Sequence, residues 1–260
     1  MDDTKIIQLN NIRIHHCLLF LTSSKGLEIS FDDTLIVIPP NTLVFVEKNM
    51  LLKVRVSCGN FPAIISLDDS TMRFVFGFLL QVFDIKSIEN MSGKKIYLRE
   101  TVPEDIYLFD RLKKYINEGI RITKPKETMA LILPIVLHFL LEFDINIIRS
   151  ISCVVKPTTT DKVLDIISQD LSKPWKISMI SEEMFISEIS LRKRLENEGT
   201  TFMNILTDAR MMHSLKLLTM SDYNINTIAY KVGYNSSSYF IKTFKRHFGL
   251  TPRQITPTFQ

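Results

Sequence analysis

The hydrophobic positions near the C-terminal end of the chain predict two helices joined by a tight turn. The first helix has an apolar face with i, i+3, i+4, i+7 spacing, formed by Ile225, Ile228, Ala229 and Val232. The second has a phenylalanine every four residues, at Phe240, Phe244 and Phe248. Gly233 can supply the left-handed turn between them, and Asn235 or Ser236 can cap the second helix. Because the outer face of the second helix is basic, the segment is typical of a helix-turn-helix that binds the major groove of DNA.

The same pattern occurs about fifty residues earlier in the chain. Its first helix has an apolar face at Ile177, Ile180, Ser181 and Met184. Ser187 then stands as an N-cap, and Leu191 and Leu195 correspond to Phe240 and Phe244. Phe185 occupies the turn position of Gly233, where a bulky residue at positive φ costs on the order of 1–2 kcal/mol. We therefore expect a second helix-turn-helix unit that turns differently or is less rigid.

A long helix is predicted between the two units, over Thr201–Met220. Its apolar residues are spaced mostly three to four positions apart, as on one face of a helix: Phe202, Ile205, Leu206, Ala209, Met212, Leu215 and Leu218. Such a helix is about 30 Å long, close to the roughly 34–36 Å between major-groove faces one DNA turn apart. One monomer can thus place both recognition helices in successive major grooves.

Helical geometry indicates which side chains would face the bases. With the leucine stripe inward, a rotation of about 100° per residue places four residues outward or on the flank: Ile189, Arg192, Lys193 and Glu196. With the phenylalanine stripe inward, the outward set of the second unit, together with the N-cap position, is Asn235, Ser236, Ser238, Lys242, Lys245 and Arg246. Arg and Lys can read guanine, and an isoleucine can contact a thymine methyl. A solvated charged face would explain one basic helix, but two units at this spacing favour DNA binding.

The N-terminal half has a different hydrophobic pattern. From Asn11 to Leu67 it consists of short runs of apolar, or alternating apolar and polar, residues, separated by residues typical of turns. These runs predict a compact antiparallel barrel or sandwich. Helices are then expected at 70–83, 103–118 and 126–144, the last of which is apolar enough either to pair with a second subunit or to lie buried within the domain. A Pro/Thr segment at 156–160 marks the boundary, so we expect an α+β chain with domains at 1–155 and 161–260.

A small barrel can enclose a ligand, and five polar residues are candidates to bind an anionic one. Treating 12–21 as one strand, parity places Arg13 and His15 on one face and His16 on the other, while Lys53 and Arg55 lie on a later strand. The plain alternative for each is a solvated strand face. Adjacent histidines on opposite faces cannot chelate one ion, so no metal site is expected.

Composition adds few constraints. The 260 residues carry a formal charge of only +4, so total charge alone does not indicate a nucleic-acid partner. Cys17, Cys58 and Cys153 lie far apart without a CxxC pair, which is typical of a reduced protein. The N-terminal segment has no apolar signal core, so a cytoplasmic location is expected.

One long motif resembles the signature of the AraC/XylS transcription regulators. It reads Ala229-x3-Gly233-Tyr234-x4-Tyr239-Phe240-x-Lys242-x-Phe244-Lys245-x2-Phe248-Gly249-x-Thr251-Pro252. The resemblance covers residues 160–257 and implies seven helices with two helix-turn-helix units on a shared linker helix. Base-contacting positions of relatives match Ile189, Arg192, Lys193, Ser237, Ser238 and Lys242; Ser237 enters by this resemblance alone. The chain lacks the aromatic-arginine pair usual after Pro252, so the last helix should be short.

Within that family, the stretches NNIRIHH, ISEISLRKRLENEGT and SSSYFIKTFKRHFGLTP look most like the Rns- and ToxT-type virulence regulators of enteric bacteria. The resemblance implies a cupin-like N-terminal domain. It also implies an effector, because some members bind a fatty acid between their domains and close relatives respond to bicarbonate. His15 matches a ligand-contacting histidine of that group. The partner basic position is Ser66 here, which leaves Arg13, Lys53 or Arg55 to supply the charge.

These observations predict a sequence-specific DNA-binding transcription regulator, with activation of virulence genes favoured. Its expected partners are promoter DNA, RNA polymerase, a small effector and a second copy bound through the N-terminal helices, and no cofactor or membrane is expected. One alternative is a barrel enzyme with an appended DNA-binding domain, which would need a nucleophilic cysteine with a nearby base, or a metal cluster. Another is a DNA-binding repressor or antagonist without an effector.

Overall fold

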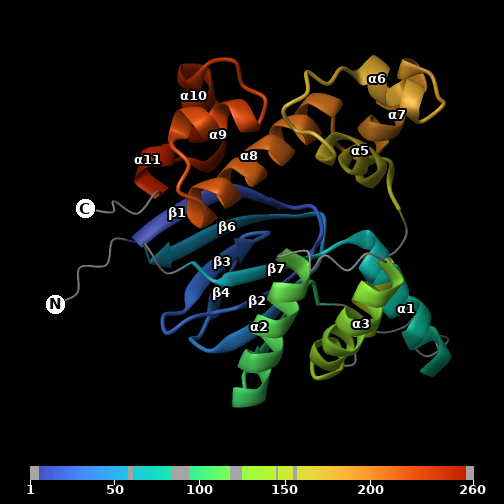
Figure 1. The fold of residues 1–260 in the computed structure, drawn as a ribbon, viewed down its shortest axis with the longest axis vertical. Helices are drawn as coiled ribbons and strands as arrows, with labels where there is room; N and C mark the ends of the chain where they lie inside the picture. Colours follow the sequence, from blue (N-terminus) through green and yellow to red (C-terminus); the bar gives the residue numbers. More distant parts are fainter. Residues whose placement is uncertain are drawn as a thin grey trace. The chain divides into compact units, whose positions relative to one another are not determined.

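The computed structural model describes residues 6–57, 61–82, 94–117, 125–144, 146–154 and 157–255 (Figure 1). The chain divides into two compact units. One comprises Ile14–Lys156; the other comprises Met1–Arg13 together with Pro157–Gln260. Of the three cysteines, Cys17 is buried as a free thiol, whereas Cys58 and the side chain of Cys153 lie outside the described residues.

Antiparallel strands form two sheets in the N-terminal unit. One contains β6, β3 and β4 in that order, with bounds Met50–Ser57, Leu27–Phe31 and Thr34–Ile38. The other has the order β7-β2-β5-β8, with bounds Ala63–Leu67, Cys17–Leu21, Thr42–Val46 and Ile96–Glu100. The predicted α+β class is confirmed, and among the described strands the two sheets remain separate, so the barrel is not closed. β8 was not predicted, since it lies alone in a helical stretch of sequence.

The predicted first strand is wrong in one respect that bears on function. The run from Ile12 to Leu21 is two strands, because β1 (Ile6–Ile14) ends before β2 begins at Cys17. His15 and His16 therefore lie in the link between strands, where alternation of faces does not apply. The parity argument that grouped His15 with Arg13 fails for this reason.

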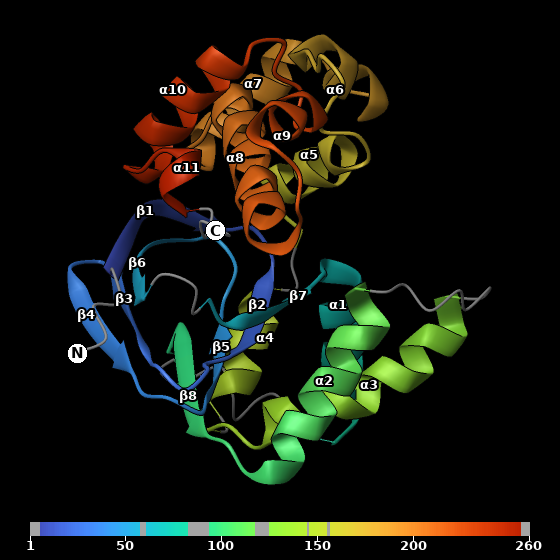
Figure 2. The ribbon, with the colours of Figure 1, turned by 60° about the vertical axis from the view of Figure 1, so that its left-hand side comes forward.

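Four helices complete the N-terminal unit: α1 (Asp69–Val82), α2 (Pro103–Asn117), α3 (Pro125–Leu141) and α4 (Ile147–Val154). Figure 2 shows α1, α2 and α3 side by side. Their apolar residues join those of β2, β5 and β7 in one buried cluster, with Val136, Phe139 and Leu140 fully inaccessible. Most of the apolar run of α3 is therefore used inside its own unit, while Leu131 and Leu141 remain exposed.

Seven helices follow in residues 157–255, at the positions that the sequence predicts to within a few residues. Their bounds are α5 Thr159–Ser168, α6 Ile177–Glu183, α7 Glu188–Asn197, α8 Phe202–Met220, α9 Ile225–Lys231, α10 Ser237–Phe248 and α11 Pro252–Ile255. Helices α6 and α7 form the first helix-turn-helix unit, and α9 and α10 form the second. The last helix is short, as expected.

Both units turn in the same way, so the expectation of a different first turn is wrong. Phe185 adopts φ 55° and Gly233 φ 81°. In the first unit the N–H of Ile186 donates to the carbonyl of Ser181 at 3.0 Å, and in the second the N–H of Tyr234 donates to that of Ala229 at 2.9 Å. These are the hydrogen bonds of a Schellman helix end, which needs a left-handed residue at its centre. The first unit forms that turn with a phenylalanine.

The beginning of the chain groups with the helical unit rather than with residues 14–156, which differs from the predicted 1–155 domain. Two side chains of β1 explain the difference. Asn11 Nδ2 donates to the backbone carbonyl of His247 at 2.8 Å, and Arg13 Nε lies 2.6 Å from Asp208 Oδ2. These pairings join residues about two hundred positions apart, which a local sequence pattern cannot indicate.

Candidate nucleic-acid interface

Helix α7 presents one apolar and one polar face. The Ser187 hydroxyl accepts a hydrogen bond from the Ser190 N–H at 3.2 Å and so begins the helix. Leu191 and Leu195 are buried against α5, α6 and α8. The predicted outward residues are all exposed: Ile189, Arg192, Lys193 and Glu196. The buried leucines therefore hold this set toward solvent.

Helix α10 is built in the same way. Ser236 caps it by accepting from the Tyr239 N–H at 3.4 Å. Phe240, Phe244 and Phe248 are fully buried, and their rings pack at inclined angles, with successive centroids 5.7 and 4.6 Å apart. Exposed positions are Asn235, Ser236, Ser238, Lys242, Lys245 and Arg246, while Ser237 is half-buried. No acidic residue lies on this helix, so its exposed side is cationic.

Helix α8 separates the two helix-turn-helix units. Figure 1 shows α5, α6 and α7 at one end of α8 and α9, α10 and α11 at the other. Its 19 residues correspond to about 28 Å at 1.5 Å per residue. This length is comparable with the spacing of successive major grooves, about 34 Å. The length of α8 is thus of the size that binding of α7 and α10 to two successive grooves requires.

Sequence reasoning missed Arg210, which lies in α8 and connects the two halves of the helical unit. Its guanidinium donates to the carbonyls of Leu171 and Lys173 at 3.1 and 2.8 Å. It also lies over the ring of Tyr234, 5.7 Å from the ring centroid. Tyr234 follows the turn of the second unit, so Arg210 ties that turn to the segment that precedes the first unit. Nothing in its spacing distinguishes Arg210 from an exposed helix cation.

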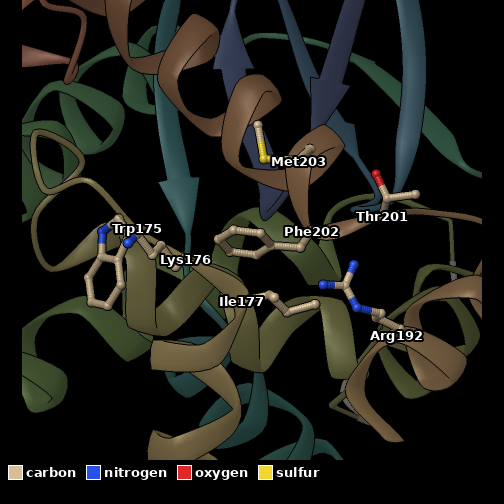
Figure 3. Close-up of a pocket in the computed structure, with 7 residues that line it drawn as sticks. All are labelled: Trp175, Lys176, Ile177, Arg192, Thr201, Phe202 and Met203. Atoms are coloured by element: carbon tan, nitrogen blue, oxygen red, sulfur yellow. The ribbon is translucent and has the colours of Figure 1, made fainter. Parts of the chain in front are cut away.

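A pocket of about 300 Å³ lies beside the first recognition helix. Figure 3 shows the Arg192 side chain extending toward Phe202 and Ile177, and Trp175, Lys176, Thr201 and Met203 complete the lining. Arg192 also lies 3.3 Å from Glu188, one helical turn earlier. The apolar wall and the carboxylate restrict the side chain while leaving it accessible, which suits a residue that recognises bases.

A half-buried charge cluster joins β1, α8 and the end of α10. Asp208 is 2.6 Å from Arg13 and 3.8 Å from His247. Burial raises the pKa of Asp208, and the nearby Arg13 guanidinium acts against that rise. Burial also lowers the pKa of His247, against the attraction of Asp208. The cluster lies behind the recognition face and holds α10 against α8.

The five predicted effector residues have different surroundings. Arg13 is paired with Asp208, and Arg55 is paired with Glu28 at 2.7 Å on an exposed sheet face that also holds Lys53. His15 and His16 are half-buried between β1 and β2. Arg13 is also half-buried, whereas Lys53 and Arg55 are exposed.

A buried lysine near these histidines was not predicted. Lys48 has a side chain 2% exposed, and its Nζ lies 3.0 Å from Asp69 Oδ2. His16 Nδ1 lies 4.0 Å from the other oxygen of Asp69. The only sequence signal was a Lys-Asn turn after β5, which is usually solvated. The N-terminal unit therefore has a buried Lys48–Asp69 pair with a histidine beside it.

The comparisons with known proteins agree with this geometry. Residues 180–256 match a family described as a helix-turn-helix domain. The chain is 32% identical to the transcriptional activator AggR of Escherichia coli over 99% of this chain and 97% of that protein. It is 28% identical to the dual transcriptional regulator Rns of Escherichia coli over 100% and 97%.

Solved structures of ToxT from Vibrio cholerae share the fold. One aligns with a TM-score of 0.65 at 19% identity over 98% of this chain and 94% of that one. Another, at 17% identity over 98% and 92% with the same TM-score, is of unsaturated fatty acid bound ToxT.

The fold and the two cationic recognition faces define a transcription regulator with a pair of helix-turn-helix units. The chain belongs to the AraC/XylS family of DNA-binding transcription regulators, with AggR and Rns among its relatives.

Two further observations bear on the alternatives. None of the described helices is long and apolar enough to cross a membrane. Burial raises the pKa of the Cys17 thiol to about 12, so this cysteine is protonated at neutral pH and cannot act as a thiolate nucleophile.

Proposed function

We propose that the protein activates transcription by binding promoter DNA with both helix-turn-helix units, one in each of two successive major grooves. The observation that carries this proposal is the placement of two exposed cationic helix faces at the two ends of α8. Relatives named as transcriptional activators, including AggR, support activation rather than repression. Virulence genes are the proposed targets, because other relatives include the virulence regulon activator VirF of Shigella flexneri.

Within this proposal, the first unit supplies the stronger base contacts. Arg192 and Lys193 can bind guanine or phosphate. Ile189 can contact a thymine methyl, and the carboxylate of Glu196 can accept a hydrogen bond from the amino group of cytosine. In the second unit Lys242 and Ser238 point away from the buried stripe and would reach bases. The remaining set, namely Asn235, Ser236, Ser237, Lys245 and Arg246, would position the helix on the phosphates.

Regulation by a small anion, a fatty acid or bicarbonate, is the second part of the proposal. It is supported by the fatty acid bound ToxT structure and by the half-buried His15 and His16. An effector would act by favouring one arrangement of the helical unit over another. Two protein partners are proposed. One is RNA polymerase, and the other is a second copy of this chain, which would bind through the N-terminal helices.

A selection from random duplex DNA tests the DNA-binding part. We expect one bipartite sequence to be enriched, and Arg192→Ala and Lys242→Ala each to weaken binding to it by about 1–3 kcal/mol. Arg194→Ala is the matched control for α7, because Arg194 is exposed on the other flank of the same helix. Failure to enrich any sequence, or wild-type affinity in both variants, would contradict the assignment.

The effector and the direction of regulation have separate tests. Purified protein titrated with a long-chain fatty acid or with bicarbonate should change its affinity for the selected duplex or its thermal stability. No change with either compound would remove the effector from the proposal. A promoter-reporter assay separates activation from repression, since a repressor would lower the basal signal.

A further inference from the structure

Phe185 is the one bulky residue that the described chain places in a left-handed backbone conformation. Six non-glycine residues there have positive φ, and five of them are asparagine or aspartate: Asn11, Asp32, Asp33, Asn41 and Asn49. Those types tolerate this region because their short polar side chains bond locally. Phe185, at φ 55°, has no such compensation. Its backbone conformation therefore destabilises the free protein.

The ring gains nothing within the chain in return. Phe185 is 94% exposed, more than the other exposed large hydrophobic residues of the described chain. The equivalent position of the second unit is different, because a Cβ on Gly233 would lie 2.6 Å from the carbonyl oxygen of Leu171. That site excludes a side chain, whereas the first unit has open space and presents a phenyl ring to solvent. Strained residues that persist without an internal benefit are candidates for function.

The position of Phe185 identifies its partner. It precedes the N-cap Ser187 by two residues, and Ile189, in the first turn of α7, is 80% exposed. The N-terminal part of a recognition helix is the part that contacts base edges. Two large apolar side chains at this end are therefore continuous with the exposed cations Arg192 and Lys193. The cations attract the phosphates and bring the apolar pair to the groove.

We propose that Phe185 is a specificity-determining residue that, with Ile189, contacts the 5-methyl groups of thymines in the DNA site of the first unit. A phenyl ring has no hydrogen-bond donor or acceptor, so it cannot read the polar edge of a base. The thymine methyl is the apolar feature of the major groove. This inference rests on the proposed DNA-binding function and adds a base preference to it.

Two substitutions separate the ring from the backbone strain. Phe185→Gly removes the ring and relieves the backbone strain. Phe185→Ala also removes the ring, but the backbone strain remains. We expect Phe185→Gly to raise the Tm by a few degrees. We expect both variants to bind the selected duplex roughly 3- to 10-fold more weakly, as the loss of one or two buried methyl contacts implies.

Deoxyuridine tests the methyl contact directly. Each thymine of the first unit's half-site is replaced in turn by deoxyuridine, which lacks only the 5-methyl group. At least one replacement should weaken the wild type roughly 3- to 10-fold and leave Phe185→Gly and Phe185→Ala unaffected. A replacement at a thymine that Ile189 contacts should weaken all three proteins. Val37→Ala, at an exposed apolar residue of β4, is the control and should bind as the wild type does.

Several outcomes would overturn the inference. The inference fails if both variants bind within twofold of the wild type. It also fails if their loss of affinity is equal on thymine and deoxyuridine duplexes, which would place the ring on the sugar-phosphate backbone. Unchanged DNA affinity with lost reporter activation would place it on a protein partner. Failure of the wild type to enrich any sequence would instead contradict the proposed function itself, so the two failures are distinguishable.

Discussion

Arg13, on the first strand, forms an ion pair with Asp208, in the middle of the helix that joins the two helix-turn-helix units, with 2.6 Å between Nε and Oδ2. The Asp208 side chain is 14% exposed and that of Arg13 is 36% exposed. His247, at the end of the second recognition helix, lies 3.8 Å from the same carboxylate. Strand β1 thus contacts α8, the helix that sets the spacing of the two helix-turn-helix units.

Removal of Arg13 should destabilise the helical unit more than removal of Asp208. Arg13→Ala leaves a mostly buried carboxylate without its cation, which costs about 1–3 kcal/mol. Asp208→Ala leaves a cation that water can still reach, so its cost should be about 1 kcal/mol. Trp175, the single tryptophan, lies in the helical unit and is 8% exposed, so its fluorescence during urea unfolding measures this difference.

The exposed Glu28–Arg55 pair, 2.7 Å apart, is the control for these substitutions. Arg55→Ala should change the free energy of unfolding by less than about 1 kcal/mol. Equal effects of Arg13→Ala and Arg55→Ala would mean that the Arg13–Asp208 pair behaves as an ordinary surface pair.

Two glycines with similar backbone angles should respond differently to alanine. Gly233 has φ 81° and a Cβ there would meet Leu171 and Arg210, whereas Gly199 has φ 72° and open space around it. Gly199→Ala should cost only the conformational strain, about 1 kcal/mol. Gly233→Ala should cost at least about twice as much and weaken DNA binding, because it displaces the second turn. Thermal unfolding of the two variants checks this, and equal shifts in Tm would contradict the close packing around Gly233.

Acid should destabilise the helical unit through His213. Burial, followed by the nearby Lys216 and Lys231, lowers the pKa of this histidine below its usual 6.5. Between the folded pKa and 6.5 the unfolded chain therefore binds more protons, so the stabilisation present above pH 6.5 is lost as pH falls. His213→Gln should flatten the pH dependence of the free energy of unfolding between about pH 5 and 7.5. Identical slopes for wild type and variant would show that His213 does not contribute.

Local patterns predicted the helical unit well because each of its elements has a local cause. The leucine and phenylalanine stripes fixed the inward faces of α7 and α10, and Ser187 and Ser236 cap the helices as expected. The exposed base-facing residues followed from those two facts. The geometry of the first turn did not follow, since the sequence suggested that Phe185 would make this turn different or less rigid, whereas Phe185 adopts the left-handed conformation that the turn needs.

Contacts between residues far apart in the sequence could not be predicted from local patterns. Arg13 looked like a ligand-binding cation of a strand, but its partner Asp208 is nearly two hundred residues away. Lys48 looked like a turn residue, but it is buried against Asp69. The link at His15 and His16 was hidden in an uninterrupted run that resembled one strand. In each case the partner is chosen by tertiary packing, which hydrophobic periodicity does not encode.

The spacing of the two half-sites tests the central claim most directly. Helix α8 holds the two units at a fixed separation, so a duplex with five base pairs inserted between the half-sites turns one half-site to the opposite side of the DNA. Fluorescence anisotropy with the selected duplex and the inserted duplex should show a loss of affinity of at least about 100-fold, toward the non-specific level. Equal affinity for the two duplexes would contradict simultaneous binding by both units of one chain.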